Sequence, residues 1–274
     1  MNALKSVELT IVAVVALLIG GVLVTSSHAR VDMGSVVGLW LLDGDGDGDV
    51  ALDSSENGHD GTITGGPNPT DGKFGDALEF DGANDFIDCG NDEALNLDTF
   101  TVMFWANMPS TQGWNHMVSR GSHVAAGTPG SVNWGVMVYD AAEMFLYEVF
   151  EDTEWSGIST NISLGDWHHV VATYDGDQDR MEFFIDGVSK GSAAAATVEL
   201  DASRHFRIGG ISTSGLLPEN YFRGSIDEVA YFDEVVSLED IQNIMNNGLI
   251  DVLNITAVSP GGKAAITWAE LKAQ

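Results

Sequence analysis

The feature that most constrains the fold is a series of short segments in which apolar and polar residues alternate, separated by clusters of Gly, Asp, Asn and Pro. Successive side chains of a β-strand point to opposite faces, so this pattern is typical of strands with one buried face. The segments recur about every ten residues, which is the spacing of all-β sandwiches and jelly rolls. The main predicted strands are residues 36–42, 75–82, 85–89, 100–108, 116–119, 133–139, 143–149, 155–160, 167–174, 181–185, 196–200, 206–211 and 221–232.

Two Asp-Gly pairs predict tight turns between neighbouring strands, because Gly adopts the positive φ that short hairpins need. Asp81-Gly82 ends the segment 75–82, and the segment 85–89 follows. These two strands are therefore expected to form a hairpin. Asp186-Gly187 predicts a second hairpin after residues 181–185.

The last strand, residues 221–232, carries an acid at Asp227 within an apolar segment. Strict alternation would place Ile226 and Glu228 on one face and Asp227 on the other. A buried carboxylate needs a hydrogen-bond donor, a cation or a metal ion as partner. A short amphipathic helix is expected next, with Ser237 as its N-cap and a stop at Asn247-Gly248.

The charge of the chain excludes one class of partner. Asp and Glu number 41 against 11 Lys and Arg, which gives a formal net charge of −30. Such a chain is repelled by nucleic-acid backbones and by anionic membrane surfaces, so nucleic-acid binding is not expected. The single cysteine, Cys89, allows no intrachain disulfide and is expected to be a small buried residue.

The N-terminal residues 1–29 resemble a secretory signal: Lys5 precedes an uncharged run, and Ser27-His28-Ala29 offers small residues for cleavage. The strongly apolar part, residues 9–24, is short for a membrane span of roughly 20 residues. An uncleaved N-terminal anchor is the alternative, so the chain is expected to be secreted or held at the cell surface or in the periplasm. Residues 34–248 are predicted to form one domain, and residues 249–274 a tail or an extra strand.

An acid-glycine segment follows the first strand. Asp43, Asp45 and Asp47, with Gly48 and Val50, match the first eight positions of an EF-hand calcium loop. Ser54 replaces the glutamate of the twelfth position, and no helix pattern flanks the segment. A flexible acidic turn, a weak calcium contact and an EF-hand type of site all remain open for residues 43–49.

Six segments in the same order resemble the laminin-G-like, concanavalin A-like family of jelly-roll domains. They are residues 38–42 (Gly-Leu-Trp-Leu-Leu), 53–61 (Asp-Ser-Ser-Glu-Asn-Gly-His-Asp-Gly), 72–82 (Gly-Lys-Phe-Gly-Asp-Ala-Leu-Glu-Phe-Asp-Gly), 167–170 (Trp-His-His-Val), 184–187 (Phe-Ile-Asp-Gly) and 224–229 (Gly-Ser-Ile-Asp-Glu-Val). The resemblance implies an all-β, two-sheet antiparallel jelly-roll sandwich with one short C-terminal helix. Glu56 departs from the family pattern, which more often has Gly there.

The resemblance also implies a structural calcium ion, held between the first loop and the Ile-Asp-Glu strand. The matching oxygen ligands are Asp53, Asn57, Asp227 and, less securely, Asp81. Hard oxygen donors favour calcium over zinc. The alternative is that these side chains cap main-chain N–H groups in turns. His168 and His169 point to opposite faces of a strand, so they are not expected to chelate one metal ion.

The expected function is non-catalytic binding of glycans or extracellular proteins. Trp114, Trp134 and Trp155 lie near loops and are the candidates for stacking on sugars, although burial is an alternative for each. Glucanases of this fold place alternate acids on one strand, and no such triplet is present around Asp227. A structural or adhesive surface protein without a small ligand, and a divergent polysaccharide hydrolase or lyase, are the other hypotheses.

Overall fold

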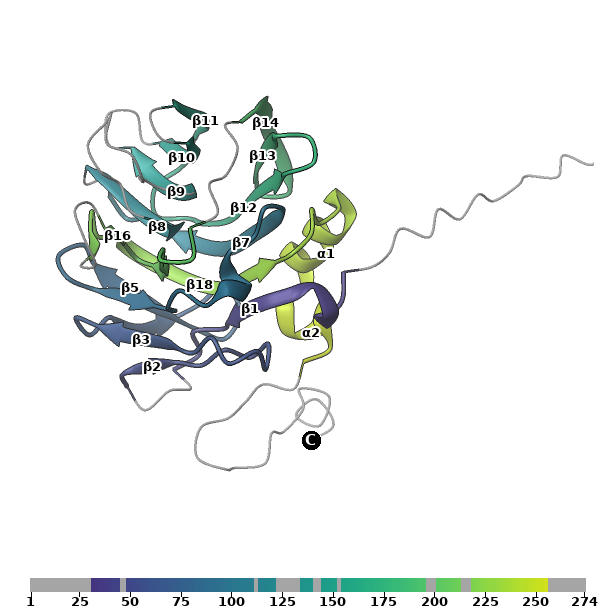
Figure 1. The fold of residues 1–274 in the computed structure, drawn as a ribbon. Coiled ribbons are helices and arrows are strands. Elements are labelled where there is room, and N and C mark those ends of the chain that lie inside the picture. The colour runs from purple at the N-terminus through teal and green to yellow at the C-terminus, as the bar shows by residue number, and fades with distance from the viewer. Residues whose placement is uncertain are drawn as a thin grey trace, which may run out of the picture. The chain divides into compact units, whose positions relative to one another are not determined.

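The computed structural model describes residues 31–44, 48–110, 113–121, 134–139, 144–151, 154–195, 201–212 and 218–255. Two eight-stranded antiparallel sheets make up most of the described chain (Figure 1). The predicted all-β sandwich is therefore confirmed. The N-terminal segment 1–29 and most of the tail, 256–274, lie outside the described residues, as do predicted strand 196–200 and positions 45–47 of the acidic segment.

Sheet A has the strand order β14-β13-β12-β7-β18-β5-β4, and β1 also pairs with β18. Its strands are β1 (Val36–Trp40), β4 (Asn68–Asp71), β5 (Asp76–Asp81), β7 (Phe100–Asn107), β12 (Trp167–Asp175), β13 (Arg180–Ile185), β14 (Val188–Ala194) and β18 (Arg223–Phe232). The hairpin predicted at Asp186-Gly187 is confirmed, because these two residues join β13 to β14 with φ of 54° and 68°.

Sheet B has the strand order β11-β10-β9-β8-β15-β6-β3-β2. Its strands are β2 (Val50–Ala51), β3 (Gly61–Thr64), β6 (Phe86–Asp88), β8 (Trp114–Arg120), β9 (Trp134–Tyr139), β10 (Met144–Glu151), β11 (Glu154–Asn161) and β15 (Phe206–Ile208). A separate two-stranded sheet pairs β16 (Ile211–Ser212) with β17 (Pro218–Glu219). Two 3₁₀ turns, η1 (Met33–Ser35) and η2 (Glu93–Leu95), complete the β part.

The hairpin predicted around Asp81-Gly82 is wrong. β5 pairs with β18 and β4 in sheet A, whereas β6 pairs with β15 and β3 in sheet B. The Asp-Gly turn carries the chain from one sheet to the other, so β5 pairs with the preceding β4 and the distant β18, and β6 with β3 and β15.

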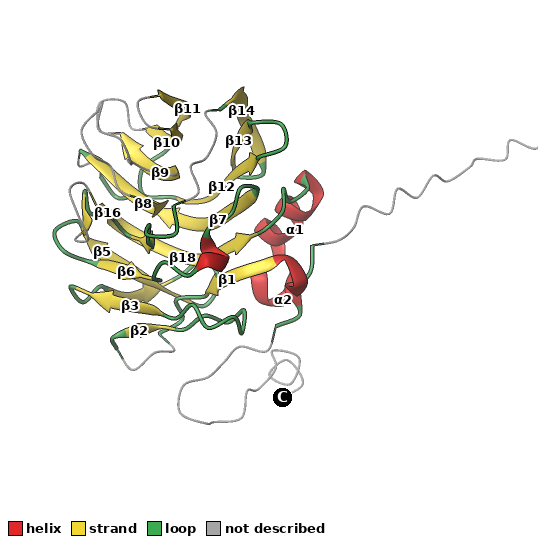
Figure 2. Ribbon diagram, viewed as in Figure 1, coloured by secondary structure: helices red, strands yellow, loops and turns green. Residues whose placement is uncertain are grey.

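The larger core lies between the sheets, and aromatic side chains occupy its centre. Phe100 and Trp134 have ring centroids 4.9 Å apart, and Phe206 and Tyr231 have theirs 5.0 Å apart. A second core lies on the other face of sheet A. There Met103 and residues of β1, β12 and β18 pack against the two helices, which stand beside β1 and β18 (Figure 2).

The alternation predicted for the last strand is interrupted by a β-bulge. The register of β18 against β7 shifts between Asp227 and Ala230, and Glu228 has a φ of 48°. Ile226 and Val229, three residues apart, consequently both face the core between the sheets. The predicted grouping of Ile226 with Glu228 on one face is wrong, because the extra residue of the bulge resets the alternation.

The helix predicted after this strand is confirmed. Helix α1 (Leu238–Asn247) begins after Ser237, whose hydroxyl accepts the N–H of Asp240 at 3.1 Å, and it ends at Gly248. A second helix, α2 (Leu249–Leu253), occupies the start of the segment expected to be extended, and Leu249, Val252 and Leu253 are buried in the second core. None of the helices in the described ranges is long and apolar enough to cross a membrane.

Candidate functional site

Two adjacent acids of the β-bulge are almost fully buried: Asp227 is 0% and Glu228 is 3% exposed. Asp227 Oδ2 accepts the main-chain N–H groups of Lys73 at 2.7 Å and of Phe74 at 3.0 Å. Burial raises the pKa of Asp227 to about 7, although these two hydrogen bonds act in the opposite direction. The sequence-based expectation that this acid needs hydrogen-bond donors is therefore met by the loop between β4 and β5.

Glu228 is held by a different segment. Both of its carboxylate oxygens lie 3.2 Å from the N–H of Leu249, the first residue of α2. Burial, and then the neighbouring charge of Asp227, raise the pKa of Glu228 to about 8. The bulge thus joins the last strand to the β4–β5 loop through Asp227 and to the helices through Glu228.

A pocket of about 710 Å³ opens where these segments meet, and it is called the polar pocket below. It is lined by Asp43, Lys73, Phe74, Gly75, Glu228, Asn246, Asn247, Gly248, Ile250 and Asp251. The lining comes from the end of β1, the β4–β5 loop, the bulge and the junction of α1 with α2. Three carboxylates and two amides face one ammonium group and one aromatic ring in this pocket.

Two glycines bring the walls of the polar pocket together. Gly75 has a φ of 72°, and a Cβ atom there would lie 2.3 Å from Asp43 Oδ1. Gly248 has a φ of 81°, and a Cβ atom there would lie 3.2 Å from both Glu228 and Phe74. Side chains at these positions would be strained and would crowd the pocket.

Lys73 and Phe74 pack on a neighbouring tryptophan. Lys73 Nζ lies 4.5 Å from the ring centroid of Trp105, and the Phe74 ring lies 6.1 Å from it at an interplanar angle of 65°. The His169 ring also packs on Trp105, with ring centroids 5.0 Å apart, and burial lowers the pKa of His169 to about 3. His168 Nδ1 binds Asp186 Oδ2, and the main-chain N–H of His169 donates to Asp186 Oδ1.

The four predicted calcium ligands do not meet in one place. Asp53 Oδ1 accepts the N–H groups of Leu39 and Ser55, and its Oδ2 accepts that of His59. Asp227 Oδ2 instead accepts the N–H groups of Lys73 and Phe74, so the two carboxylates bind different segments of the chain. The predicted convergence of Asp53 with Asp227 is therefore not found.

Asn57 binds β1, and Asp81 stabilises its own turn. Asn57 Nδ2 donates to the carbonyl oxygens of Val36 and Val37, at 2.9 and 3.1 Å. Asp81 Oδ1 accepts the N–H of Ala83 at 2.7 Å. Across the described ranges, no group of three or more His, Cys, Asp or Glu residues is arranged to hold a metal ion. The four residues do not fit one calcium site, and the alternative role of capping N–H groups describes Asp53 and Asp81.

The structure describes only one of the three tryptophan side chains that were predicted to stack on sugars. Trp134 is 0% exposed in the aromatic core, so the prediction that it stacks on a sugar is wrong. It begins β9, but the rings of Phe100, Phe206 and Tyr231 pack against it. The side chains of Trp114 and Trp155 lie outside the description of the structure. Cys89 is buried and burial raises its pKa, in agreement with a structural role.

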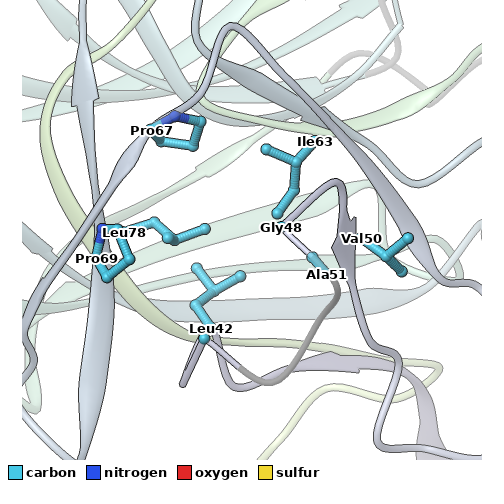
Figure 3. Close-up of a pocket in the computed structure, with 9 residues that line it drawn as sticks. Leu42, Gly48, Val50, Ala51, Ile63, Pro67, Pro69 and Leu78 are labelled. Atoms are coloured by element: carbon cyan, nitrogen blue, oxygen red, sulfur yellow. The ribbon is translucent and has the colours of Figure 1, made fainter. Parts of the chain in front are cut away.

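A second pocket, of about 280 Å³, is apolar and lies near the edge strands of the two sheets. Figure 3 shows its walls, with Leu42 and Leu78 opposite Ile63, and with Pro67 and Pro69 along one side. Strand prediction missed β4, which carries Pro69, because residues 65–72 have the composition of a loop.

Comparison of the sequence with protein-family models agrees with this architecture. Residues 81–242, more than half of the chain, match the concanavalin A-like lectin/glucanases superfamily, in its laminin-G division. The chain belongs to this superfamily. No curated protein sequence matches it.

Solved structures of the superfamily fold are similar at low sequence identity. Domain 4 of the extracellular arabinanase AbnA from Geobacillus stearothermophilus, in complex with arabinotriose, superposes with a TM-score of 0.58 at 19% identity, over 77% of this chain and 98% of that domain. The binding domain of Paraclostridial Mosquitocidal Protein 1 gives 0.59 at 15% identity, over 78% of this chain and 52% of that chain. Trypanosoma rangeli sialidase, in complex with sialic acid, gives 0.56 at 17% identity, over 77% and 33%. At 15–19% identity these similarities show the fold alone. The chain spans about half of the toxin chain and a third of the sialidase.

None of the residues that line the polar pocket, apart from Asp43, was singled out from the sequence as a site residue. The Gly-Lys-Phe-Gly and Asn-Asn-Gly segments carry a signal for turns with polar side chains. That signal does not say that two turns 170 residues apart line one pocket.

Proposed function

We propose that the chain is a non-catalytic glycan-binding module and that the polar pocket is its binding site. The observation that supports this most is the pocket itself: its lining combines carboxylate and amide side chains with a half-buried aromatic side chain, Phe74. Sugars present hydroxyl donors and apolar C–H faces, and such a lining suits both. The similar arabinanase domain was solved with arabinotriose, which supports a glycan over a protein partner.

The test is a glycan array with the purified protein, followed by calorimetry on each hit. Asn246→Ala and Asp251→Ala remove exposed side chains from the pocket and should weaken binding of every hit at least about tenfold, the effect of losing one good hydrogen bond. Asp177→Asn, in the exposed turn between β12 and β13, is the matched control and should bind as wild type. An array without hits, or hits that both pocket variants bind normally, would contradict the proposal.

Absence of catalysis is part of the proposal. The strongly perturbed acid Asp227 is enclosed behind the β4–β5 loop and is held by its N–H groups, whereas Glu228 is tied to α2. Two carboxylates that serve structural contacts are poorly placed to act on a glycosidic bond. Incubation with laminarin-type and arabinan polymers should release no reducing ends, and release that Glu228→Gln abolishes would show a hydrolase instead.

Export and calcium binding complete the proposal. We expect secretion with cleavage after Ala29, and mass spectrometry of the exported N-terminus distinguishes it from an uncleaved anchor. Calcium stabilisation stays a prediction taken from the family resemblance, without support from the four nominated residues. The test is a calorimetric titration of calcium into protein that has been treated with a chelator. If calcium produces neither heat nor a shift in the melting temperature, the protein does not bind it.

A further inference from the structure

We infer that the polar pocket selects glycans that carry only hydroxyl or amino groups and rejects glycans that carry carboxylate or sulfate groups, with Asp43 and Asp251 as the residues that set this selectivity. The inference rests on the proposed function, and it adds the class of glycan. Its basis is the balance between hydrogen-bond donors and acceptors in the pocket wall.

Four main-chain donors at the pocket are already used within the protein. The N–H groups of Lys73 and Phe74 donate to Asp227. The N–H of Asp76 donates to Asp43 at 2.8 Å, and that of Leu249 donates to Glu228. Anion-binding pockets in proteins depend on free main-chain N–H groups, and these four are not free for a ligand.

The side-chain amides are arranged in the same way. Asn246 Nδ2 donates to the carbonyl of Gln242 at 2.6 Å, and Asn247 Nδ2 donates to that of Asn243 at 2.9 Å. Each amide nitrogen carries two N–H donors, and Asn247 Nδ2 also donates to Asn243 Oδ1 at 2.9 Å, so Asn247 offers mainly its oxygen to a ligand and Asn246 has at least one donor engaged. The wall formed by α1 is therefore an acceptor surface, which suits a hydroxyl or ammonium donor.

Charge adds to this preference. Asp43 is half-buried and Asp251 is exposed, and both line the pocket with Glu228. The one lysine of the lining, Lys73, holds its ammonium group over the ring of Trp105. Asp43 and Asp251 outnumber Lys73, so the pocket would repel a ligand carboxylate and attract a ligand ammonium.

The experiment compares three matched probes: trimers of galactose, galactosamine and galacturonic acid, measured by calorimetry at low and at high salt. The expected result is that the galacturonate trimer binds at least about tenfold more weakly than the galactose trimer at low salt, with a smaller gap at high salt. The galactosamine trimer should bind at least as tightly as the galactose trimer.

Variants assign the effect to the pocket. Asp43→Asn with Asp251→Asn should narrow the gap between neutral and acidic trimers several-fold, while Asp177→Asn, which removes the same kind of charge elsewhere, should leave it unchanged. Equal binding of the neutral and acidic trimers would overturn the selectivity alone. Asp177→Asn could instead narrow the difference in affinity between neutral and acidic trimers as much as the pocket variants do. Selectivity would then come from the overall charge of the protein, and the roles of Asp43 and Asp251 would be overturned. Absence of binding by these trimers and by every member of the array would overturn the proposed function as well.

Discussion

The Asp227 carboxylate lies 2.7 Å from the main-chain nitrogen of Lys73, a residue 154 positions earlier in the chain. This contact fixes the β4–β5 loop against the bulge of the last strand, and it places Lys73 and Phe74 at the wall of the polar pocket. The same bulge ties Glu228 to the first residue of α2. The shape of the pocket therefore depends on two buried carboxyl groups.

Stability of the wild-type protein is expected to fall as pH rises from about 4 to 8. The pKa of Asp227 is raised to about 7 and that of Glu228 to about 8, so the folded state holds these protons more tightly than the unfolded state. The free energy of unfolding then decreases across the interval between the unfolded and folded pKa values, by an amount on the order of 4 kcal/mol for each acid. Urea unfolding from pH 4 to 9 measures it, and a flat or rising profile would contradict the prediction.

Two substitutions of Asp227 separate its charge from its hydrogen bonds. Asp227→Asn keeps an oxygen for the N–H groups of Lys73 and Phe74, so it should weaken the pH dependence while retaining the fold. Asp227→Ala leaves both N–H groups without their acceptor, and it should lower the free energy of unfolding by about 1–3 kcal/mol at pH 5 as well. A wild-type pH profile in both variants would show that another group titrates.

A second pH-dependent contact joins His168 to Asp186. His168 Nδ1 lies 2.8 Å from Asp186 Oδ2, and this hydrogen bond raises the pKa of His168 above its ordinary value of 6.5. The stabilisation is complete below about pH 6.5 and is lost as pH rises through the folded pKa.

Asp186→Asn should lower the pKa of His168, as followed by NMR titration of the imidazole signals. Asn tolerates the φ of 54° at this position, so the hairpin should persist. Asp177→Asn, nine residues earlier in an exposed turn, provides the control and should leave the titration unchanged. An unaltered titration in Asp186→Asn would mean that the pair does not control His168.

Trp134 is expected to matter for stability and not for ligand binding. Its ring packs between Phe100, Phe206 and Tyr231, and Trp134→Ala should lower the free energy of unfolding by about 3–5 kcal/mol. Denaturant unfolding measures this loss. If the variant keeps its stability and loses only glycan binding, the stacking role predicted from its position near a loop is correct after all.

Local patterns predicted the elements whose causes are local. The alternation in residues 100–108 and 167–174 matches β7 and β12, because one face of each strand is apolar over its whole length. Ser237 and Gly248 mark the ends of α1. The Ser237 hydroxyl accepts the N–H of Asp240 in the first turn, and Gly248, with its positive φ, donates its N–H to the carbonyl of Ile244 in the last turn. Asp186-Gly187 was recognisable for the same reason.

Several features did not follow from local patterns. β5 and β6 were expected to pair because they are adjacent, but they lie in different sheets, where β5 pairs with β4 and β18, and β6 with β3 and β15. The bulge at Asp227 and Glu228 has no marker in the strand itself, since its support comes from Lys73, Phe74 and Leu249. The calcium ligands taken from the family resemblance are a further example, because residue types shared with a family do not ensure the same arrangement in space.

The sequence by itself determined the fold class, most strands, the capped helix and the need of Asp227 for a partner, because alternation, caps and the cost of a buried charge act within a few residues. Only the tertiary structure decided which strands pair, which face each acid of the bulge meets, and that Asp43, Phe74, Asn246 and Asp251 line one pocket. The physical reason is that hydrogen bonds and packing join segments up to two hundred residues apart, and local patterns carry no information about such distances.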